Sequence, residues 1–364
     1  MHHEIVALEC IHQPLPESFH LDSPHTYTLT RYDRTDASQL AARLHNATIV
    51  IVTTVSIGAE VLAPDVTPAL RLVAVMATGT DPVDVEACKK RGIRVTNCPA
   101  ANLDSVSEHA ISLYFAARRR TVLLDRATRQ VPSEWMEKRT LTGKLRFSDG
   151  KPPLTCGDEV LGVVGYGGLG MCRVLRERGK APWIANVGTS GKRIAALGRA
   201  LGMHVLIAAR KQQVTDDGVS GLLPLPNHGD RVPFEEVLRQ STFIVLSLPR
   251  NPQTLNLLST PEFDIMSPYA VLVNIARGGI VDEAALLKAL SDGRIAGYGT
   301  DVFEKEPAEG PDDSILLTNE AKDLNITMSP HLAWFSQRTM ANLGQILKNT
   351  VEAWVHGTEL NVIV

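Results

Sequence analysis

Few features of secreted, membrane-spanning or metal-binding proteins are present in this sequence of 364 residues. Its five cysteines are widely spaced and include no C-x-x-C pair, which is typical of reduced thiols rather than of a disulfide framework or a zinc site. The first ten residues lack the basic and apolar regions of a secretory signal, and no apolar run approaches the roughly 20 residues of a membrane helix. We therefore expect a soluble cytoplasmic protein with no metal site and no membrane partner.

A strong charge of either sign is also lacking. The 37 Lys and Arg residues nearly balance the 40 Asp and Glu residues, for a net charge of −3, which argues against a nucleic-acid-binding protein. Hydrophobic residues make up 44% of the chain, so a disordered protein is excluded. At about 150 residues per domain, the length predicts two domains.

The first hundred residues alternate between helical and β-rich segments. Residues 37–45 and 85–91 have helical spacing, whereas strands are predicted at 5–10, 26–32, 47–52, 70–76 and 93–96. Several of these strands are continuously apolar, which is typical of a parallel sheet covered on both faces. The pattern predicts a doubly wound α/β domain.

A second set of elements begins after a long helical pattern at 105–120 and a polar, irregular stretch at 132–158. Helices are predicted between most of the strands, which fall at 160–164, 205–208, 243–248, 271–275, 297–302 and 325–328. The spacing indicates a second doubly wound unit. A final helical pattern at 336–356 is long enough to return to the first domain.

The strand at 160–164 runs directly into Gly165-Tyr166-Gly167-Gly168-Leu169-Gly170, the pattern G-x-G-x-x-G. In a dinucleotide-binding loop the first glycine permits a tight turn, and the second lets a pyrophosphate approach the backbone. The third allows the following helix to pack closely. Glycines also cluster in ordinary turns, so a purely structural turn is the alternative. The preceding apolar strand favours a cofactor loop.

The residues after these glycines do not continue as a helix. Glycine and proline interrupt any helical pattern until Gly191. Ala209, at the end of the next strand, lies 44 positions after Gly165. That is twice the spacing of about 20 residues at which a ribose-binding acid usually follows the loop. Removal of the 21 residues 171–191 leaves 23 positions and an uninterrupted strand, loop, helix and strand.

We hypothesise that residues 171–191 are a retained intron or a gene-model error. The segment corresponds to 63 nucleotides, which keeps the reading frame. Its ends can be encoded with a GTATGT splice donor at Gly170-Met171-Cys172 and an AG acceptor at Ser190-Gly191. The alternative is a genuine surface loop in which Gly191 takes over the position of the third glycine. Transcript reads that join Gly170 directly to Lys192 would support the first hypothesis, and their absence would refute it.

Four blocks of sequence together resemble one enzyme family. They are ATGTDPVD at 77–84, GYGGLG at 165–170, VNIARGGIVDE at 273–283, and GTDVFEKEP at 299–307 with SPHLAW at 329–334. In their order and spacing the chain resembles the D-isomer-specific 2-hydroxyacid dehydrogenases, which include glyoxylate/hydroxypyruvate reductases and glycerate dehydrogenases. The resemblance extends from about residue 70 to the end of the chain and is interrupted by the segment 171–191.

This resemblance implies an α/β architecture of two doubly wound domains. A flavodoxin-like substrate domain would be built from both chain ends, residues 1–103 and 336–364. A Rossmann dinucleotide-binding domain would lie between them at 104–335, with the atypical insert at 171–191. The family also implies a homodimer.

Reduction of a 2-oxo acid needs a cation for the carboxylate and an acid for the developing alkoxide. The family's catalytic arginine, glutamate and histidine fall on Arg277, Glu306 and His331. We therefore interpret Arg277 as the substrate-binding cation, His331 as the acid, and Glu306 as the partner that raises the pKa of His331. Without the resemblance, a surface ion pair, a solvated carboxylate and a satisfied histidine would be the simpler interpretations.

Further positions acquire roles from the same resemblance. Thr78 and Gly79 match the loop whose backbone N–H groups receive the substrate carboxylate, and Asp301 matches a carboxylate near the nicotinamide ring. Pro249 and Ile275 align with backbone stretches that line the cofactor cleft. A plain turn and a strand-end cap are the alternatives for Gly79 and Asp301.

The end of the second Rossmann strand predicts the choice of cofactor. An NAD enzyme places an acidic residue there to bind the ribose 2′-OH. This chain has Ala209, followed by Arg210 and Lys211, which would attract a 2′-phosphate. We predict that NADP(H) is preferred over NAD(H), with two exposed loop charges as the alternative.

Together these residues predict an oxidoreductase that transfers a hydride between NADP(H) and a small 2-oxo or 2-hydroxy acid, with glyoxylate or hydroxypyruvate as the substrate. Glu306 argues against formate dehydrogenase, a relative with glutamine in that place. Two alternatives stay open: a dinucleotide-sensing, corepressor-like binding protein of the same fold, and a chain inactivated by the insert.

Overall fold

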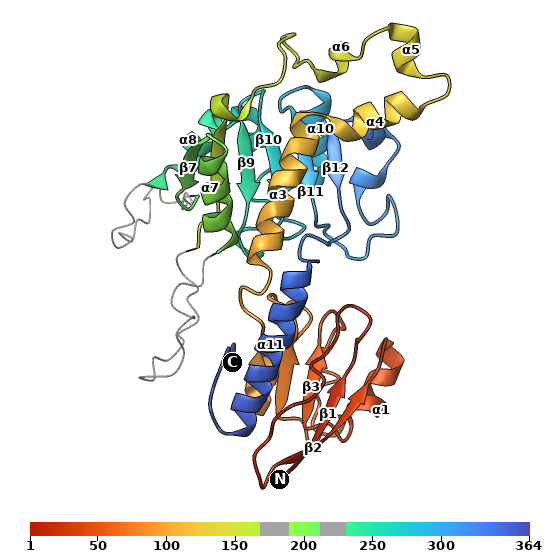
Figure 1. The fold of residues 1–364 in the computed structure, drawn as a ribbon, viewed down its shortest axis with the longest axis vertical. Coiled ribbons are helices and arrows are strands. Elements are labelled where there is room, and N and C mark those ends of the chain that lie inside the picture. The colour runs from red at the N-terminus through yellow and green to blue at the C-terminus, as the bar shows by residue number, and fades with distance from the viewer. Residues whose placement is uncertain (168–188, 212–230) are drawn as a thin grey trace, which may run out of the picture. The chain divides into compact units, whose positions relative to one another are not determined.

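The computed structural model describes residues 1–167, 189–211 and 231–364 (Figure 1). These residues form two compact units. The first comprises Met1–Asn102 and Phe335–Val364, and the second comprises the described residues from Leu103 to Trp334. In the parts of the chain that are described, every helix is too short or too polar to cross a membrane.

The first unit is built on a five-stranded parallel sheet with the order β2-β1-β3-β4-β5. Its strands are β1 (His2–Ala7), β2 (Thr26–Arg31), β3 (Ile49–Val52), β4 (Leu72–Val75) and β5 (Arg94–Thr96). Every residue of β3 and β4 is buried, as expected for apolar strands between two layers of helices. This strand order is that of flavodoxin-like folds, so the predicted fold class of the unit is confirmed.

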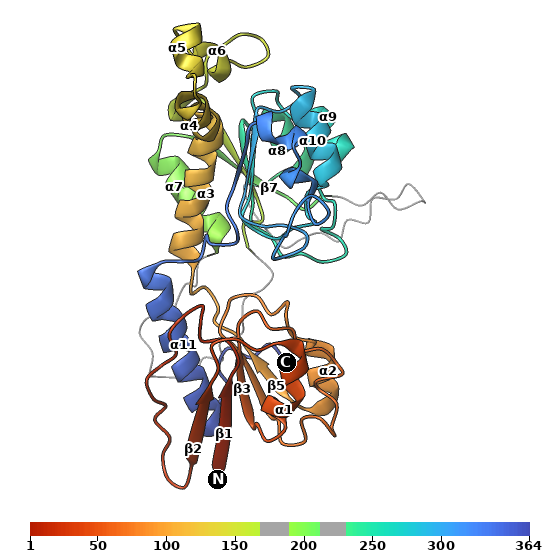
Figure 2. The same cartoon turned by 90° about the vertical axis from the view of Figure 1, so that its right-hand side faces the viewer.

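Helices cover both faces of this sheet (Figure 2). On one side lies α11 (Gln337–Val355), which packs against β4. On the other side lie α2 (Val85–Arg91) and α1 (Leu40–Leu44), which follows the 3-10 turn η1 (Ala37–Gln39). Asp84 caps α2 by accepting a hydrogen bond from the Ala87 N–H, and Gly92 ends the helix in the left-handed conformation.

The second unit contains a seven-stranded parallel sheet with the order β12-β11-β10-β9-β6-β7-β8. Its strands are β6 (Val160–Val164), β7 (His204–Ala208), β8 (Arg231–Val232), β9 (Phe243–Leu246), β10 (Val271–Asn274), β11 (Gly297–Thr300) and β12 (Ile326–Met328). The order reverses at β6, which pairs with β7 on one side and β9 on the other. Ligands of open α/β sheets bind at the carboxyl ends of the strands beside such a switch point, so this edge positions the site.

Two layers of helices enclose the second sheet (Figure 2). On one face α3 (Leu103–Arg118) lies beside α7 (Ser190–Ala200), and the other face is covered by α8 (Phe234–Gln240), α9 (Thr260–Ile265) and α10 (Glu283–Ser291). Alternate residues of a strand point to opposite cores. Val245 belongs to the same apolar cluster as Tyr114 of α3, whereas its neighbour Ile244 belongs to the cluster that contains Phe234 of α8.

The segment between α3 and β6 forms short helices, namely α4 (Thr121–Arg129), α5 (Glu134–Lys138), α6 (Thr142–Leu145) and the 3-10 turn η2 (Cys156–Asp158). The prediction of an irregular stretch at 132–158 was wrong for α5 and α6. Neither helix contains a buried residue, so the sequence has no apolar periodicity there to mark them. The side chains of Val131, Trp135 and Met136 are exposed. Two further 3-10 turns, η3 (Ile315–Leu317) and η4 (Glu320–Asp323), precede β12.

Candidate active site

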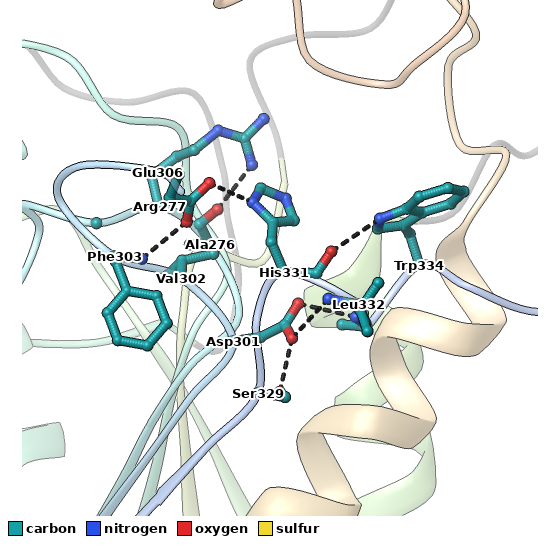
Figure 3. Close-up of polar contacts among 12 residues, drawn as sticks. Ala276, Arg277, Asp301, Val302, Phe303, Glu306, Ser329, His331, Leu332 and Trp334 are labelled. Atoms are coloured by element: carbon teal, nitrogen blue, oxygen red, sulfur yellow. Dashed lines mark hydrogen bonds and ion pairs between the residues drawn. The ribbon is translucent and has the colours of Figure 1, made fainter. Parts of the chain in front are cut away.

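The three predicted catalytic side chains lie together on loops that follow neighbouring strands of the second unit (Figure 3). Arg277 follows β10, Glu306 lies in the loop after β11, and His331 follows β12. Because β10, β11 and β12 are adjacent and parallel, the loops after them leave the same edge of the sheet. Residues that are 54 positions apart in the sequence therefore meet.

His331 and Glu306 form a hydrogen-bonded ion pair. Nδ1 of His331 lies 2.5 Å from Oε2 of Glu306, and the other carboxylate oxygen of Glu306 accepts a hydrogen bond from the Phe303 N–H at 2.8 Å. The two side chains are 42% and 33% exposed, so the pair is open to solvent on one side. Since Nδ1 is engaged by Glu306, Nε2 is the ring nitrogen that could meet another group.

The charges of this pair shift the pKa of each partner toward the ionised form. The hydrogen bond to Glu306 raises the pKa of His331 above its ordinary value of 6.5. It outweighs burial, which acts in the opposite direction, and the charge of Asp301 adds to the increase. Burial acts to raise the pKa of Glu306, but the hydrogen bond and charge of His331 outweigh it and hold that pKa below its usual range. The site thus favours an imidazolium beside a carboxylate.

Arg277 places a third charge at this site. Its guanidinium lies near Glu306 and His331 (Figure 3), and one guanidinium nitrogen donates to the Ala276 carbonyl at 2.7 Å. The positive charge of Arg277 helps to lower the pKa of both Glu306 and His331. Asn274, at the end of β10, fixes the backbone here by donating from its side chain to the Arg277 carbonyl at 2.9 Å. The planar guanidinium of Arg277 thus lies beside the imidazole of His331.

The backbone of His331 is held in the left-handed region, with φ of 55°. This conformation costs a residue with a Cβ about 1–2 kcal/mol, so the surrounding contacts must impose it. The His331 N–H donates to the Asp301 carbonyl at 2.8 Å, and the His331 carbonyl accepts from Trp334 Nε1 at 2.9 Å. These two bonds fix the direction in which the imidazole leaves the chain.

Asp301 ties the loop that carries His331 to the end of β11. Its side chain is only 3% exposed. One carboxylate oxygen accepts hydrogen bonds from Ser329 Oγ at 2.6 Å and the Leu332 N–H at 2.9 Å, and the other accepts from the Ala333 N–H at 2.8 Å (Figure 3). These contacts are those of a cap at a strand end, the alternative that the sequence left open for this residue.

Sequence reasoning missed His109 of α3, which reaches the same loop. Its Nε2 lies 2.7 Å from Ser329 Oγ and 3.6 Å from Asp301 Oδ1. Neither motif nor spacing distinguishes His109 from the other histidines, because the contact depends on how α3 packs against the sheet. His109, Ser329 and Asp301 together form a chain of polar groups beside the loop that carries His331.

The switch point lies between the ends of β6 and β9. Gly165, directly after β6, has a φ of 98°, and a Cβ placed on it would lie 2.2 Å from the Ser247 carbonyl oxygen. Only glycine fits between these two strand ends. Pro249 and Ile275 follow β9 and β10 on the same edge. Gly168, Leu169 and Gly170, which were predicted to bind the cofactor, lie outside the described residues.

The two basic residues after β7 have different surroundings. Arg210 is exposed, whereas Lys211 forms an ion pair with Glu262 of α9, with 2.7 Å between Nζ and Oε1. A further cation, Arg231 of β8, donates to the Ala208 carbonyl at 3.2 Å and so lies at the end of β7. Arg231 was not predicted, because only the pairing of β7 with β8 brings it there.

Thr78 and Gly79 belong to the first unit, where they follow β4 at the carboxyl edge of its sheet. The Thr78 hydroxyl lies 3.2 Å from the Cys98 carbonyl and 3.2 Å from Asn102 Oδ1, and the Thr78 carbonyl accepts from Asn97 Nδ2 at 2.7 Å. These bonds fix the backbone of the turn. Arg277, Glu306 and His331 all belong to the second unit.

Comparisons with known proteins show the family of the chain. The family model described as "D-isomer specific 2-hydroxyacid dehydrogenase, NAD binding domain" matches residues 172–333. The chain is 35% identical over 341 residues to a glycerate dehydrogenase of Methylorubrum extorquens, covering 93% of this chain and 92% of that protein. It is 31% identical over 299 residues to a glyoxylate reductase of Thermococcus gammatolerans, covering 80% of this chain and 75% of that protein.

A solved structure supports the same fold at lower identity. The glyoxylate reductase from "Paecilomyes thermophila" superposes with a TM-score of 0.71 at 21% identity, over 99% of this chain and 98% of that one. At this identity the likeness concerns the fold alone, and it confirms two α/β units, one with the Rossmann topology.

Proposed function

The chain belongs to the D-isomer-specific 2-hydroxyacid dehydrogenase family, and from that premise we propose that it reduces glyoxylate or hydroxypyruvate with NADPH. The observation that carries the proposal is the His331–Glu306 ion pair beside Arg277 on the carboxyl edge of β10, β11 and β12. A positive fork and a proton donor together suit a substrate with a carboxylate next to a carbonyl. Relatives named glycerate dehydrogenase and glyoxylate reductase support the choice of a small acid.

The residues divide the reduction between binding and proton transfer. Arg277 binds the substrate carboxylate through its guanidinium fork and draws electron density from the neighbouring carbonyl. When bound, a reduced nicotinamide supplies the hydride that the C2 carbon receives. His331 donates its Nε2 proton to the C2 oxygen as charge develops there, which completes the hydroxyl group. In the opposite direction the neutral imidazole accepts that proton.

Glu306 acts through His331 rather than on the substrate. Its bond to Nδ1 fixes the ring orientation and keeps the imidazole protonated, since it raises the pKa of His331. The same bond keeps a negative charge available to stabilise the imidazolium. We assign Glu306 as a positioning residue for the acid.

The second unit also suits a dinucleotide. The glycine at the end of β6 leaves the backbone without a side chain at the switch point, where a pyrophosphate needs close approach. Pro249, Ile275 and Asp301 would line the nicotinamide half. We propose that residues 104–335 bind the dinucleotide. In the same proposal residues 1–103 and 336–364 bind the substrate, with the backbone at Thr78 and Gly79 receiving its carboxylate.

NADPH preference is assigned mainly to Arg210. It is exposed directly after β7, and Arg231 adds a second cation at that strand end, while Lys211 is engaged by Glu262. We expect Arg210→Ala to lower kcat/KM with NADPH about tenfold and to leave the value with NADH nearly unchanged. Arg199→Ala, an exposed cation at the end of α7, is the control. Higher kcat/KM with NADH than with NADPH in the unaltered chain would refute the preference.

Two further proposals concern the state of the protein. The described cysteines are free thiols, which supports a reducing compartment such as the cytoplasm. They are Cys10, Cys88, Cys98 and Cys156.

The exposed apolar side chains of Val131, Trp135 and Met136 support a homodimer formed through the second unit. Light scattering should give twice the chain mass, and Trp135→Glu should reduce it toward one chain.

The proposed reaction is tested by NADPH oxidation at 340 nm with the purified chain and either glyoxylate or hydroxypyruvate. We expect turnover with at least one acid. Arg277→Ala should lower kcat/KM and raise KM for the acid, whereas the same change at the exposed Arg199 should alter neither. Dinucleotide binding without turnover of any small 2-oxo acid would instead favour a sensing role.

A further inference from the structure

The turn after β6 contacts residues from farther along the chain. Gly165 and Gly167 stand before residues 168–188, and Thr189, Ser190 and Gly191 stand after them. A Cβ placed on Gly167 would lie 2.2 Å from Thr189 Cγ2, and one placed on Gly191 would lie 2.1 Å from the Gly165 carbonyl oxygen. The two flanks therefore contact each other directly.

Hydrogen bonds join the same flanks. The Thr189 hydroxyl donates to the Tyr166 carbonyl at 2.8 Å and accepts from the Lys192 N–H at 3.4 Å, which makes Thr189 the N-cap of α7. The Thr189 carbonyl accepts from the Arg193 N–H at 3.0 Å. Thr189 thus ties the turn after β6 to the first turn of the helix, the place where a dinucleotide loop joins its helix.

The described residues on the two flanks form the pattern G-x-G-x-x-G a second time. From Gly165-Tyr166-Gly167 to Thr189-Ser190-Gly191, with Lys192 next, they form G-x-G-x-x-G without Gly168, Leu169 or Gly170. Gly191 is buried at the start of α7 and touches the turn, as the third glycine of such a loop must. The first turn of α7 has no acidic residue, so no side chain there opposes an anion.

We propose that the pyrophosphate-binding loop of this chain consists of Gly165, Gly167 and Gly191, joined through Thr189, and that residues 168–188 are an insertion that the loop does not need. This inference rests on the proposed function, because it says which residues hold the dinucleotide. The requirement is positional: the residue immediately before Lys192 must lack a Cβ. If transcripts join Gly170 directly to Lys192, Gly170 stands at that position in the shorter chain.

The first experiment compares NADPH binding by the full chain and by a chain lacking residues 168–188. Binding is measured by the fluorescence of NADPH and by the shift of Tm on adding it, so no turnover is needed. We expect the shortened chain to bind with a Kd within about tenfold of the full chain, or tighter. A folded shortened chain that does not bind, beside a full chain that does, would overturn the proposal.

The second experiment adds a single methyl group to the proposed loop. Gly191→Ala in the full chain should raise the Kd for NADPH at least about tenfold, since its Cβ would meet the Gly165 carbonyl. Gly344→Ala, in α11, is the matched control, because a Cβ there meets nothing within 4 Å. Far-ultraviolet circular dichroism and Tm without ligand report whether each variant folds. Equal binding by the full chain and Gly191→Ala would overturn the loop assignment and leave the proposed function standing.

A chain lacking residues 171–191 completes the set. It removes Gly191 but places Gly170 before Lys192, so we expect it to bind NADPH. In the chain lacking 168–188, Gly191→Ala should again abolish most of the binding. Were all of these chains folded and none bound NADPH or NADH, the proposed function would fail together with the loop assignment.

Discussion

The loops that carry Arg277, Glu306 and His331 lie on the same edge of one sheet as the glycine loop, yet they are held in different ways. Around His331, polar groups bridge the gaps: Glu306 holds the imidazole, and Asp301 holds the loop through three hydrogen bonds. After β6 the closest approach is between the backbones of Gly165 and Gly191, which leave no space for a Cβ, and the Thr189 side chain adds one hydrogen bond to the turn.

This difference has opposite consequences for substitution and for insertion. A polar network depends on which side chains stand at its positions, and it loses function when one functional group changes. A glycine contact depends on the absence of side chains at its flanks. The chain between those flanks can lengthen without altering the contact, as the 21 positions between Gly167 and Thr189 indicate.

The largest expected effect comes from removing the acid while keeping its backbone. His331→Asn should lower kcat/KM for 2-oxo acid reduction by about 10²–10⁴-fold, because general acid catalysis is lost. NADPH binding should be nearly unchanged, which separates the catalytic loop from the glycine loop. His204→Asn, at the exposed start of β7, is the matched control. Activity near that of the unaltered chain would exclude His331 as the proton donor.

Removing the charge of Asp301 should weaken the network without altering its shape. Asp301→Asn replaces an acceptor of backbone N–H bonds with an amide, and leaving buried donors poorly paired costs about 1–3 kcal/mol. We expect a lower Tm and a lower kcat, measured by calorimetry and by NADPH oxidation. Asp323→Asn, on an exposed 3-10 turn, should alter neither. An unchanged Tm would show that Asp301 is not needed to hold the loop.

Removing the charge of Glu306 should shift the pH dependence of the reaction. As the proposed proton donor, His331 acts in its protonated form, so kcat/KM is expected to be highest below the raised pKa of His331 and to fall as pH rises through it. In Glu306→Gln we expect the fall to move to lower pH, toward the ordinary histidine value, so that the loss of kcat/KM is largest on the alkaline side of the profile. Glu304→Gln in the same loop should leave the profile in place. A profile that does not move would exclude the assigned role of Glu306.

The smallest expected effect concerns folding. A raised histidine pKa gives stability that is present at low pH and lost as pH rises through the folded-state pKa of His331. The lowered pKa of Glu306 gives stability that is present at higher pH and lost as pH falls through its own folded-state pKa. The pair therefore stabilises the fold between these two values. Because both side chains are partly exposed, its contribution should stay below about 1 kcal/mol, measurable by a double-mutant cycle in urea.

Much of the fold was predictable, because continuous apolar strands such as β3, β4 and β9 alternate with helices. The family was predictable from its sequence blocks, and both predictions are confirmed. The helices α5 and α6 were missed because neither buries a residue. The roles of the site residues stay predictions.

Contacts between segments that are distant in the chain could not be predicted from the sequence. His109 reaches Ser329 only because α3 packs beside the sheet, and Glu262 reaches Lys211 only through the placement of α9. For the glycine loop the sequence offered two sets of glycines with the same spacing. The choice between them depends on which glycine meets the carbonyl of Gly165, which is a property of packing.

The left-handed backbone conformation of His331 affects which substitutions directed evolution would select at this position. A histidine at φ of 55° opposes folding by about 1–2 kcal/mol, whereas glycine adopts this conformation freely and asparagine more readily than most residues. Selection for heat resistance alone would therefore favour His331→Gly or His331→Asn and discard the proton donor. The proposed acid persists only where turnover itself is under selection, which makes position 331 a marker for separating active lineages from merely stable ones.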